Sequence, residues 1–416
     1  MTTTAIPTSR PTDEELLARF RPLFERIGEH AADREKNRRL PHEGVRALRD
    51  AGFGAVRLPS EYGGLGASIP QLFLLLIELA AAESNLSQAL RVHFSFTEEI
   101  LAEPDSSRRR QWLSRIGAGA LFGAATSERG NQRGTFSTTV RAVDGRLLLN
   151  GTKHYSTGTL YSDYISTSAV NDNGEPVRLV VASDAPGVVQ QDDWRGFGQR
   201  LTASGTTRFE DVEVDPSEVV PAPRPEDPTP RHGFLQLVQL AALAGIAHRA
   251  SSDTAEFVRR RQRTFVHGSA DLVRDDHLVQ QVVGRVDSAA HAARALVLSA
   301  ASALEIAADR PDDADLAAAA DIAVYRAQVT VIELVLGATT ALFDVGGASI
   351  VDEDLRLDRH WRNARTLAVH NPVIYKQRMV GDYVLNGNRP QIQPSVGIAD
   401  SVATDGEQER TSGELT

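Results

Sequence analysis

The stretch HWRNARTLAVHNPVIYK, residues His360–Lys376, gathers side chains that can exchange protons or bind anions. It contains His360, Arg362, Arg365 and His370 around Trp361, followed by Asn371-Pro372. A histidine titrates near neutral pH and can donate a hydrogen bond, and a guanidinium can bind an anion through two hydrogen bonds. The stretch is either the lining of a catalytic pocket or a basic loop between helices. His370 is the main candidate for chemistry, and its alternative role is to cap the next helix.

An arginine cluster and a glycine pair indicate where an anionic ligand could bind. The cluster VRRRQRTF contains Arg263, which could grip a phosphate or could belong to a solvated helix end. Gly346 and Gly347, in FDVGGAS, would let the backbone approach a ligand closely, or would form a helix C-cap.

Other candidates carry structural interpretations that compete with a functional one. His93, in RVHFSFTEEI, lies between apolar residues on a predicted helix, where a core histidine is more common than a catalytic one. Thr157, in HYSTG, is a residue type that strands favour. Tyr155 and Trp194 could fill a core as most aromatic residues do, and Ser127 could lie in a plain connection.

The composition is that of an ordinary soluble globular chain of 416 residues, long enough for two or three domains. Its formal net charge of -10 argues against nucleic acid as the main partner, because phosphate contacts need surplus cations. The absence of cysteine excludes disulfides, thiolate metal sites and cysteine nucleophiles. We see no secretory signal and no apolar run of the roughly 18 residues that a membrane span needs. We therefore expect a cytoplasmic protein that does not contact a membrane.

The predicted secondary structure divides the chain into three zones and a tail. The first zone is helical, with Thr12 as an N-cap before acidic residues. The second has short strands and a hairpin at Asp144-Gly145. The third has long helices with apolar faces and predicts a four-helix bundle, and the tail has few apolar residues and is predicted to be disordered. The predicted boundaries are 12–117 for the N-terminal helical domain, 118–228 for the central β domain, 229–390 for the bundle and 391–416 for the tail.

Four segments in this order resemble the acyl-CoA dehydrogenase superfamily. They are LRDAGFGAVRLPSEYGGLGAS, GAATSERG, LNGTKHYSTGTLYSDY and GQRLTASGTTRFEDVEV, and the likeness extends from about Glu14 to Asn388. The resemblance implies an α+β fold that is mainly α-helical, with an N-terminal helical domain, a central β-barrel-like domain and a C-terminal four-helix bundle. It also implies a homotetramer.

The chain departs from the dehydrogenases at their Tyr-Glu-Gly motif, whose glutamate removes the α-proton of an acyl thioester. His370, Asn371 and Pro372 stand in its place. An amide has no basic lone pair near neutral pH, so Asn371 cannot be a general base. The segments WRNARTLAVHNPV and DDWRGFGQRLTASG instead resemble the flavin-dependent monooxygenase branch of this fold, typified by dibenzothiophene monooxygenase.

That branch implies a two-component enzyme. A separate flavin reductase supplies reduced FMN, with FAD as the alternative flavin. The reduced flavin reacts with O2 to a C4a-hydroperoxide, which passes one oxygen atom to a small, apolar substrate at sulfur, nitrogen or carbon. The chain has no Gly-x-Gly-x-x-Gly between a strand and a helix, so no nicotinamide site is visible.

The resemblance also assigns roles to single residues. His370 and His93 would be catalytic, and Thr157 would place its hydroxyl near flavin N5, with Ser156 as a one-residue alternative. The assignments for binding are Tyr155, Ser127, Arg263, Gly346, Gly347 and Arg365 for the cofactor, Trp194 and Asn131 for the substrate, and no residue for a metal.

Two other functions stay open at this point. One is an acyl-CoA dehydrogenase-type flavoenzyme whose base lies on another helix, which a carboxylate facing flavin N5 would favour. The other is a non-catalytic flavin- or ligand-binding protein or an enzyme-derived scaffold. A flavin-free purified protein that neither binds reduced flavin nor consumes oxygen with it would favour this alternative.

Overall fold

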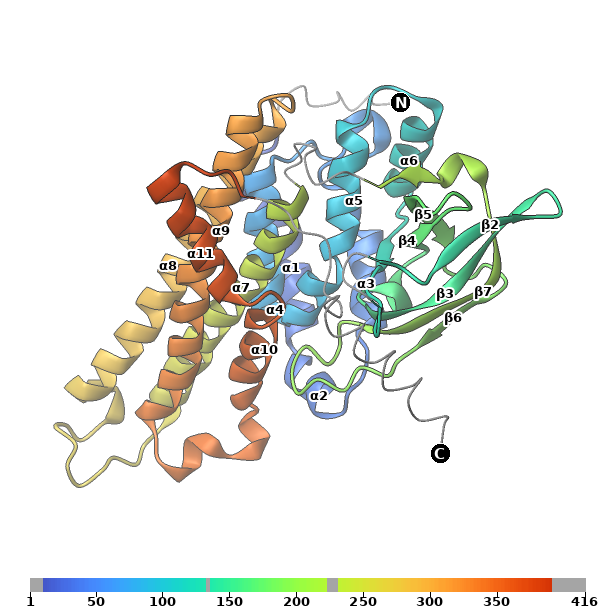
Figure 1. Ribbon diagram of the computed structural model, residues 1–416. Coiled ribbons are helices and arrows are strands. Elements are labelled where there is room, and N and C mark those ends of the chain that lie inside the picture. The colour runs from blue at the N-terminus through green and yellow to red at the C-terminus, as the bar shows by residue number, and fades with distance from the viewer. Residues whose placement is uncertain (1–9, 132–134, 223–230, 391–416) are drawn as a thin grey trace, which may run out of the picture. The chain divides into compact units, whose positions relative to one another are not determined.

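The computed structural model describes residues 10–131, 135–222 and 231–390, and the tail predicted at 391–416 lies outside the described residues. The chain divides into two compact units, and Figure 1 labels most of their helices and strands. The described parts of the helical unit are 10–120, 195–202 and 231–390, and those of the β unit are 121–131, 135–194 and 203–222. Residues 195–202, within the zone predicted as the β domain, therefore pack with the helices.

The helical unit opens with six helices, of which α1, α4 and α6 begin at a side-chain N-cap. Thr12 and Glu15 form a capping box at α1, and Ser68 and Gln71 form the same arrangement at α4. The helices are α1 (Asp13–Gly28), α2 (Ala31–Lys36), α3 (His42–Asp50), α4 (Ile69–Ala89), α5 (Arg91–Ala102) and α6 (Ser107–Gly117).

The C-terminal helices form the predicted four-helix bundle, which confirms the fold class. Five helices make up this region, three long and two short: α7 (Arg231–Arg260), α8 (His277–Ala308), α9 (Ala314–Ala341), α10 (Asp358–Ala368) and α11 (Val373–Asn386). Helices α7, α8 and α9 pack side by side, and the short α10 and α11 both pack against α9 (Figure 1). Helix α7 also packs on α4: a Cβ added at Gly245 would lie 2.4 Å from Ala80 Cβ, so glycine permits this close approach.

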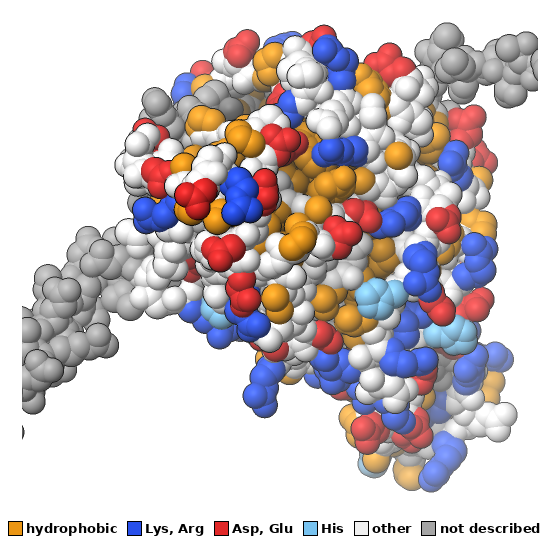
Figure 2. Space-filling view, turned by 90° about the vertical axis from the view of Figure 1, so that its right-hand side faces the viewer, with side chains coloured by type: hydrophobic (Ala, Val, Ile, Leu, Met, Phe, Trp, Pro, Cys, Tyr) orange, Lys and Arg blue, Asp and Glu red, His pale blue; other side chains and the backbone are white. Residues whose placement is uncertain are grey.

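Three helices are long and apolar enough to cross a membrane by length and composition, contrary to the expectation from the sequence. They are Ile69–Ala89, His277–Ala308 and Ala314–Val345. The apolar window of the first is 78% buried, so α4 is a core helix, but that of α8 is only 39% buried. Helix α8 therefore keeps apolar surface outside the single chain. Acidic and basic side chains are interspersed over the face that Figure 2 presents.

The β unit is an eight-stranded sheet with the order β6-β7-β3-β2-β4-β5-β8, and β1 pairs with β4. The strands are β1 (Phe122–Ala125), β2 (Thr139–Val143), β3 (Arg146–Ser156), β4 (Tyr164–Val170), β5 (Pro176–Ala182), β6 (Val188–Gln191), β7 (Gly205–Val214) and β8 (Val220–Pro221). The predicted hairpin joins β2 to β3, and Asp144 and Gly145 have φ of 48° and 78°. Positive φ at both positions is what a two-residue type I′ turn requires.

Candidate active site

Strand β3 is distorted at the tyrosine predicted to lie against the flavin. Tyr155 has a φ of 59°, and the pairing of β3 with β7 shifts register between Lys153 and Ser156. A non-glycine residue in this conformation costs roughly 1–2 kcal/mol and is found preferentially at binding sites. Tyr155 is 49% exposed, and its ring centroid lies 5.9 Å from that of Trp194 and 4.7 Å from the Arg129 guanidinium. An aromatic face is therefore available to a ligand.

Ser127 and Thr157 lie close to this bulge. The Ser127 carbonyl accepts a hydrogen bond of 2.8 Å from His154 N, next to Tyr155. The Thr157 hydroxyl lies 2.9 Å from the Ser204 hydroxyl. Ser156, the alternative position, is fully buried, and its hydroxyl has no hydrogen-bond partner among the described residues. The β unit thus brings Ser127, Tyr155, Thr157 and Trp194 to one end of β3.

A buried ion pair that sequence analysis did not single out joins the segment after Ser127 to β3. Lys153 Nζ lies 2.6 Å from Glu128 Oε1, and their side chains are 0% and 5% exposed. Ser137 donates to Glu128 from its backbone N at 2.6 Å and from its hydroxyl at 2.8 Å. Burial alone would raise the pKa of Glu128, but Lys153 and these donors lower it to about 2. Glu128 is therefore ionised at neutral pH, whereas burial lowers the pKa of Lys153 and the Glu128 charge partly offsets that effect.

Asn131, the second predicted substrate residue, is tied to the same carboxylate. Its amide nitrogen donates a hydrogen bond to Glu128 Oε2. A substrate would have to compete with Glu128 for this amide. The hydrogen bond between Asn131 and Glu128 therefore has a structural role in the segment after Ser127. Its role in substrate binding stays a prediction.

In the helical unit, His370 lies in the turn between α10 and α11. Its side chain reaches solvent, but surrounding protein desolvates most of the imidazole. This desolvation and the positive charge of Arg91 on α5 lower the pKa of His370 to about 3. Its Nδ1 lies 3.0 Å from Asn371 Nδ2, which also donates to Gln236 Oε1 at 2.8 Å. At neutral pH His370 is therefore a neutral imidazole, able to donate one hydrogen bond. Helix α11 begins after Pro372 without a side-chain cap, which is not what the capping alternative predicts.

His93 lies in the core. It is 0% exposed, its Nε2 lies 2.8 Å from Gly54 O, and its ring meets Phe94 edge-on at 5.0 Å. The contact with Gly54 O accounts for Nε2 as in a structural histidine, and complete burial argues against contact with a substrate. A catalytic role for His93 stays a prediction.

Arg263 and Gly347, predicted to bind the cofactor, line one pocket of the helical unit. The pocket has a volume of about 750 Å³, within the range of roughly 300–1,000 Å³ that is common for small-molecule sites. Arg260, Arg261 and Arg263 line it together with Phe265. Arg261 Nη1 donates to Ser349 Oγ at 2.6 Å, whereas exposed Arg263 forms no ion pair with another described residue. These donors suit a phosphate group.

Gly346 and Arg365 lie outside the lining of this pocket. A Cβ added at Gly346 would lie 2.8 Å from Ile350 Cβ, so close packing accounts for this glycine. Gly346 has φ -140° and follows a 3-10 turn, so it is not a left-handed C-cap. Arg365 is exposed on α10 and forms no ion pair with another described residue. Their predicted cofactor contacts have no support from this pocket.

Basic residues at the start of the His360–Lys376 stretch, and just before it, serve the fold. Glu35 on α2 accepts hydrogen bonds from Arg356 Nη2 at 2.7 Å and Arg362 Nη1 at 2.6 Å. Burial would raise the pKa of Glu35, but the two arginines lower it overall. These bonds hold α10 against α2 within the helical unit.

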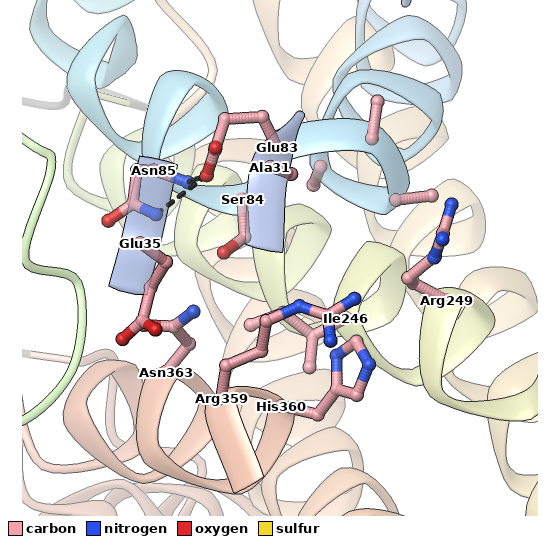
Figure 3. A pocket seen from close by; sticks show the side chains of 13 residues that line it. Ala31, Glu35, Glu83, Ser84, Asn85, Ile246, Arg249, Arg359, His360 and Asn363 are labelled. Atoms are coloured by element: carbon pink, nitrogen blue, oxygen red, sulfur yellow. Dashed lines mark hydrogen bonds between the residues drawn. The ribbon is translucent and has the colours of Figure 1, made fainter. Parts of the chain in front are cut away.

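A second ion-paired group lies beside the first. Asp253 Oδ2 is 2.9 Å from Arg359 Nη2 and 2.8 Å from His360 Nε2. Burial and the Arg359 charge lower the pKa of His360 to about 4. Figure 3 shows Arg359 and His360 side by side on α10, at a cavity of about 30 Å³. That volume holds little more than one water molecule, so this end of the stretch has no room for a substrate. A chemical role for its other end, with His370, stays a prediction.

Comparison with known proteins places the chain in a family. Family models match in order: the acyl-CoA dehydrogenase N-terminal domain over residues 11–120, the middle domain over 122–212 and the C-terminal domain over 237–374. The chain belongs to the acyl-CoA dehydrogenase family, and its relatives put it in the flavin-dependent monooxygenase branch.

Three relatives illustrate this branch. The probable FMNH2-dependent monooxygenase SfnC of Pseudomonas putida is 29% identical, over 90% of this chain and 95% of that protein. A dibenzothiophene monooxygenase of Mycolicibacterium goodii is 30% identical, over 82% of this chain and 87% of that protein. The crystal structure of FMN-bound TdsC from Paenibacillus sp. A11-2 superposes with a TM-score of 0.85 at 26% identity, covering 92% of this chain and 99% of that one.

Proposed function

We propose that this chain is the oxygenase component of a two-component monooxygenase that uses reduced FMN and O2. A separate flavin reductase supplies the reduced FMN, and a small apolar substrate is oxygenated at sulfur, nitrogen or carbon. One oxygen atom goes to the product and the other to water, and reduced FMN provides the two electrons. When bound, the flavin would supply a C4a-hydroperoxide as the oxygen donor. One relative is named a probable FMNH2-dependent monooxygenase and one similar crystal structure contains FMN, and both support FMN over FAD.

The observation that carries the proposal is the neutral His370 beside Asn371. A dehydrogenase needs a carboxylate base at this place, and the amide of Asn371 cannot take up a proton. A neutral imidazole can instead hold a proton toward a bound oxygen atom. Each unit also offers groups that suit a flavin. The β unit has the aromatic rings of Tyr155 and Trp194 and the hydroxyl of Thr157, and the helical unit has Arg263 as a donor to a phosphate.

Reduced FMN is expected to bind the purified chain more tightly than oxidised FMN. Anaerobic titration measures both affinities, and stopped-flow mixing of the reduced complex with oxygen tests for the absorbance band of the oxygenated flavin. NADH with FMN, but without a reductase, should not be consumed, since no nicotinamide motif is visible in the sequence. Rapid NADH oxidation by the pure chain would contradict the two-component assignment. A chain that binds no reduced flavin would favour the non-catalytic alternative.

Replacing Arg263 with alanine is expected to weaken FMN binding by about 10- to 100-fold, because a hydrogen bond to a charged group contributes about 1.5–3 kcal/mol. Binding of riboflavin, which lacks the phosphate, should hardly change. Arg259→Ala is the matched control, since Arg259 is exposed in the same arginine cluster but does not line the pocket. Titration of both flavins against each variant measures this. Equal weakening of FMN and riboflavin by Arg263→Ala would show that Arg263 does not bind the phosphate.

The proposal includes a homotetramer in which Arg263 reaches the flavin of a neighbouring subunit. The partly exposed apolar face of α8 supports an oligomer, because water-exposed apolar area favours association. Light scattering measures the assembly, and a monomer at micromolar concentration would rule it out.

A further inference from the structure

Asn371 stands where the dehydrogenases carry their base, and it contacts the imidazole of His370 directly. Its Nδ2 lies 3.0 Å from His370 Nδ1 and 2.8 Å from Gln236 Oε1. Gln236 belongs to α7 and is only 3% exposed, so this amide offers a fixed acceptor from a neighbouring helix. The three side chains form a short chain of hydrogen bonds that runs from α7 to the turn before α11.

The direction of these hydrogen bonds follows from the chemistry of the groups. An amide nitrogen carries two protons and accepts none. Asn371 Nδ2 therefore donates one hydrogen bond to Gln236 Oε1 and the other to His370 Nδ1. A nitrogen that accepts a hydrogen bond cannot itself be protonated, so the single proton of a neutral imidazole must lie on Nε2.

We propose that Asn371 is a positioning residue that holds His370 in the tautomer protonated on Nε2, with Gln236 fixing the orientation of the Asn371 amide. The inference rests on the proposed function, because it assigns the donor atom of His370 in that reaction. It gives the residue in place of the dehydrogenase base a new task. The carboxylate that removes a proton is replaced by an amide that prepares a neighbouring imidazole to offer one.

The charge state of His370 is compatible with this role. Desolvation and the Arg91 charge lower its pKa to about 3, so the imidazole stays neutral at neutral and mildly acidic pH. Arg91, on α5, is the charged group that shifts this titration, and the partners on α7 and in the turn, Gln236 and Asn371, are neutral. Without Asn371 the neutral ring could carry its proton on either nitrogen, and the proton on Nδ1 would leave Nε2 as an acceptor.

The first measurement reads the tautomer in the flavin-free chain. Magic-angle-spinning 15N NMR of protein labelled at its 11 histidines separates protonated from unprotonated ring nitrogens, and His370→Ala identifies the His370 signals. We expect Nδ1 to be unprotonated and Nε2 protonated at neutral pH. A protonated Nδ1, or a mixture of both tautomers, in the unsubstituted chain would overturn the inference without any variant.

The decisive variant is Asn371→Asp, which has nearly the same shape but offers only acceptors when ionised. The carboxylate should draw the proton of His370 to Nδ1 and raise the pKa of His370. Product formed per O2 consumed should fall by about 100-fold at alkaline pH, the lower range for loss of a positioned proton donor. As pH falls through the raised pKa, the imidazolium regains a proton on Nε2 and product yield should recover. A residue that only supports packing would not produce this recovery.

Asn173→Asp is the matched control, because it makes the same substitution in an exposed turn. It should change neither the tautomer nor the pH profile. An Asn371→Asp protein with the original tautomer, or with a loss of yield that acid does not reverse, would refute the positioning role. If His370→Ala itself retains full product yield, the proposed function of His370 fails instead, and the NMR result still decides the tautomer.

Discussion

A His370→Ala protein is expected to fold and bind reduced FMN as before, yet to lose oxygenation by about 100- to 10,000-fold, the usual cost of removing a positioned proton donor. The oxygen that it consumes should appear as hydrogen peroxide rather than as product. His370 reaches solvent in the turn before α11 and pairs only with Asn371 among the described residues, so its removal leaves the bundle intact. Stopped-flow absorbance, read beside counts of peroxide and product, measures the effect.

Two further variants separate chemistry from structure. His248→Ala removes an exposed histidine of α7 and should leave product yield unchanged. His370→Gln keeps an N–H donor on a flexible side chain and should restore part of the yield. Unchanged yield in His370→Ala would mean that the residue has only a local role in the turn.

Lys153→Met is expected to destabilise the β unit by about 3–5 kcal/mol, since it leaves Glu128 buried without its partner charge. The pair lies 2.6 Å apart, with both side chains at most 5% exposed. Hydrogen exchange should accelerate in β2 and β3, which this pair ties to the segment after Ser127, and not in the bundle. Exchange measured by mass spectrometry, with denaturant unfolding, tests this. The double variant Lys153→Met/Glu128→Gln removes the stranded charge and should recover part of the loss.

Lys36→Met is the matched control, because Lys36 pairs with Asp354 at 2.9 Å on the surface, where the two side chains are 47% and 84% exposed. Solvent screens such a pair, so its loss should matter little. A Lys153→Met protein as stable as Lys36→Met would contradict the role of the buried pair.

The pH dependence of the unsubstituted β unit has a definite sign. The pKa of Glu128 is lowered from 4.5 to about 2 in the folded state. The unfolded chain therefore binds a proton at a higher pH than the folded one, and the contribution of Glu128 is fully present above pH 4.5. It is lost as pH falls through this window toward 2. Glu128→Gln should remove this part of the acid sensitivity.

Features set by neighbouring residues could be predicted from the sequence. The capping box of Thr12 with Glu15 and the hairpin turn at Asp144-Gly145 each depend on a few adjacent residues. The order of helical, β and bundle zones follows from periodicity and turn signals, and the four ordered motifs led to the family. The replacement of the dehydrogenase base by Asn371 is also a matter of residue identity alone.

The tertiary structure decided which polar residues meet. Glu35 and Arg362 are 327 positions apart and Glu128 and Lys153 are 25 apart, so no local pattern relates them. The partner of His93 could not be predicted from the sequence either. An apolar helix with one histidine does not reveal that Gly54 O will accept a hydrogen bond from its ring. Residues 195–202 lie between β6 and β7 in the chain, yet Gln199 N bonds Asn363 Oδ1 of α10 at 2.6 Å.

The contact between His370, Asn371 and Gln236 combines both kinds of information. The sequence alone determined that an imidazole and an amide stand where a carboxylate base would be, because that depends only on residue types at aligned positions. Only the fold decided that α7 brings Gln236 to the Asn371 amide, 135 positions away in the chain. Local order follows from short-range steric and hydrogen-bonding preferences. The orientation of a buried polar group depends on the hydrogen-bond partner that a distant segment places beside it. The group takes that partner because leaving it unpaired costs about 1–3 kcal/mol.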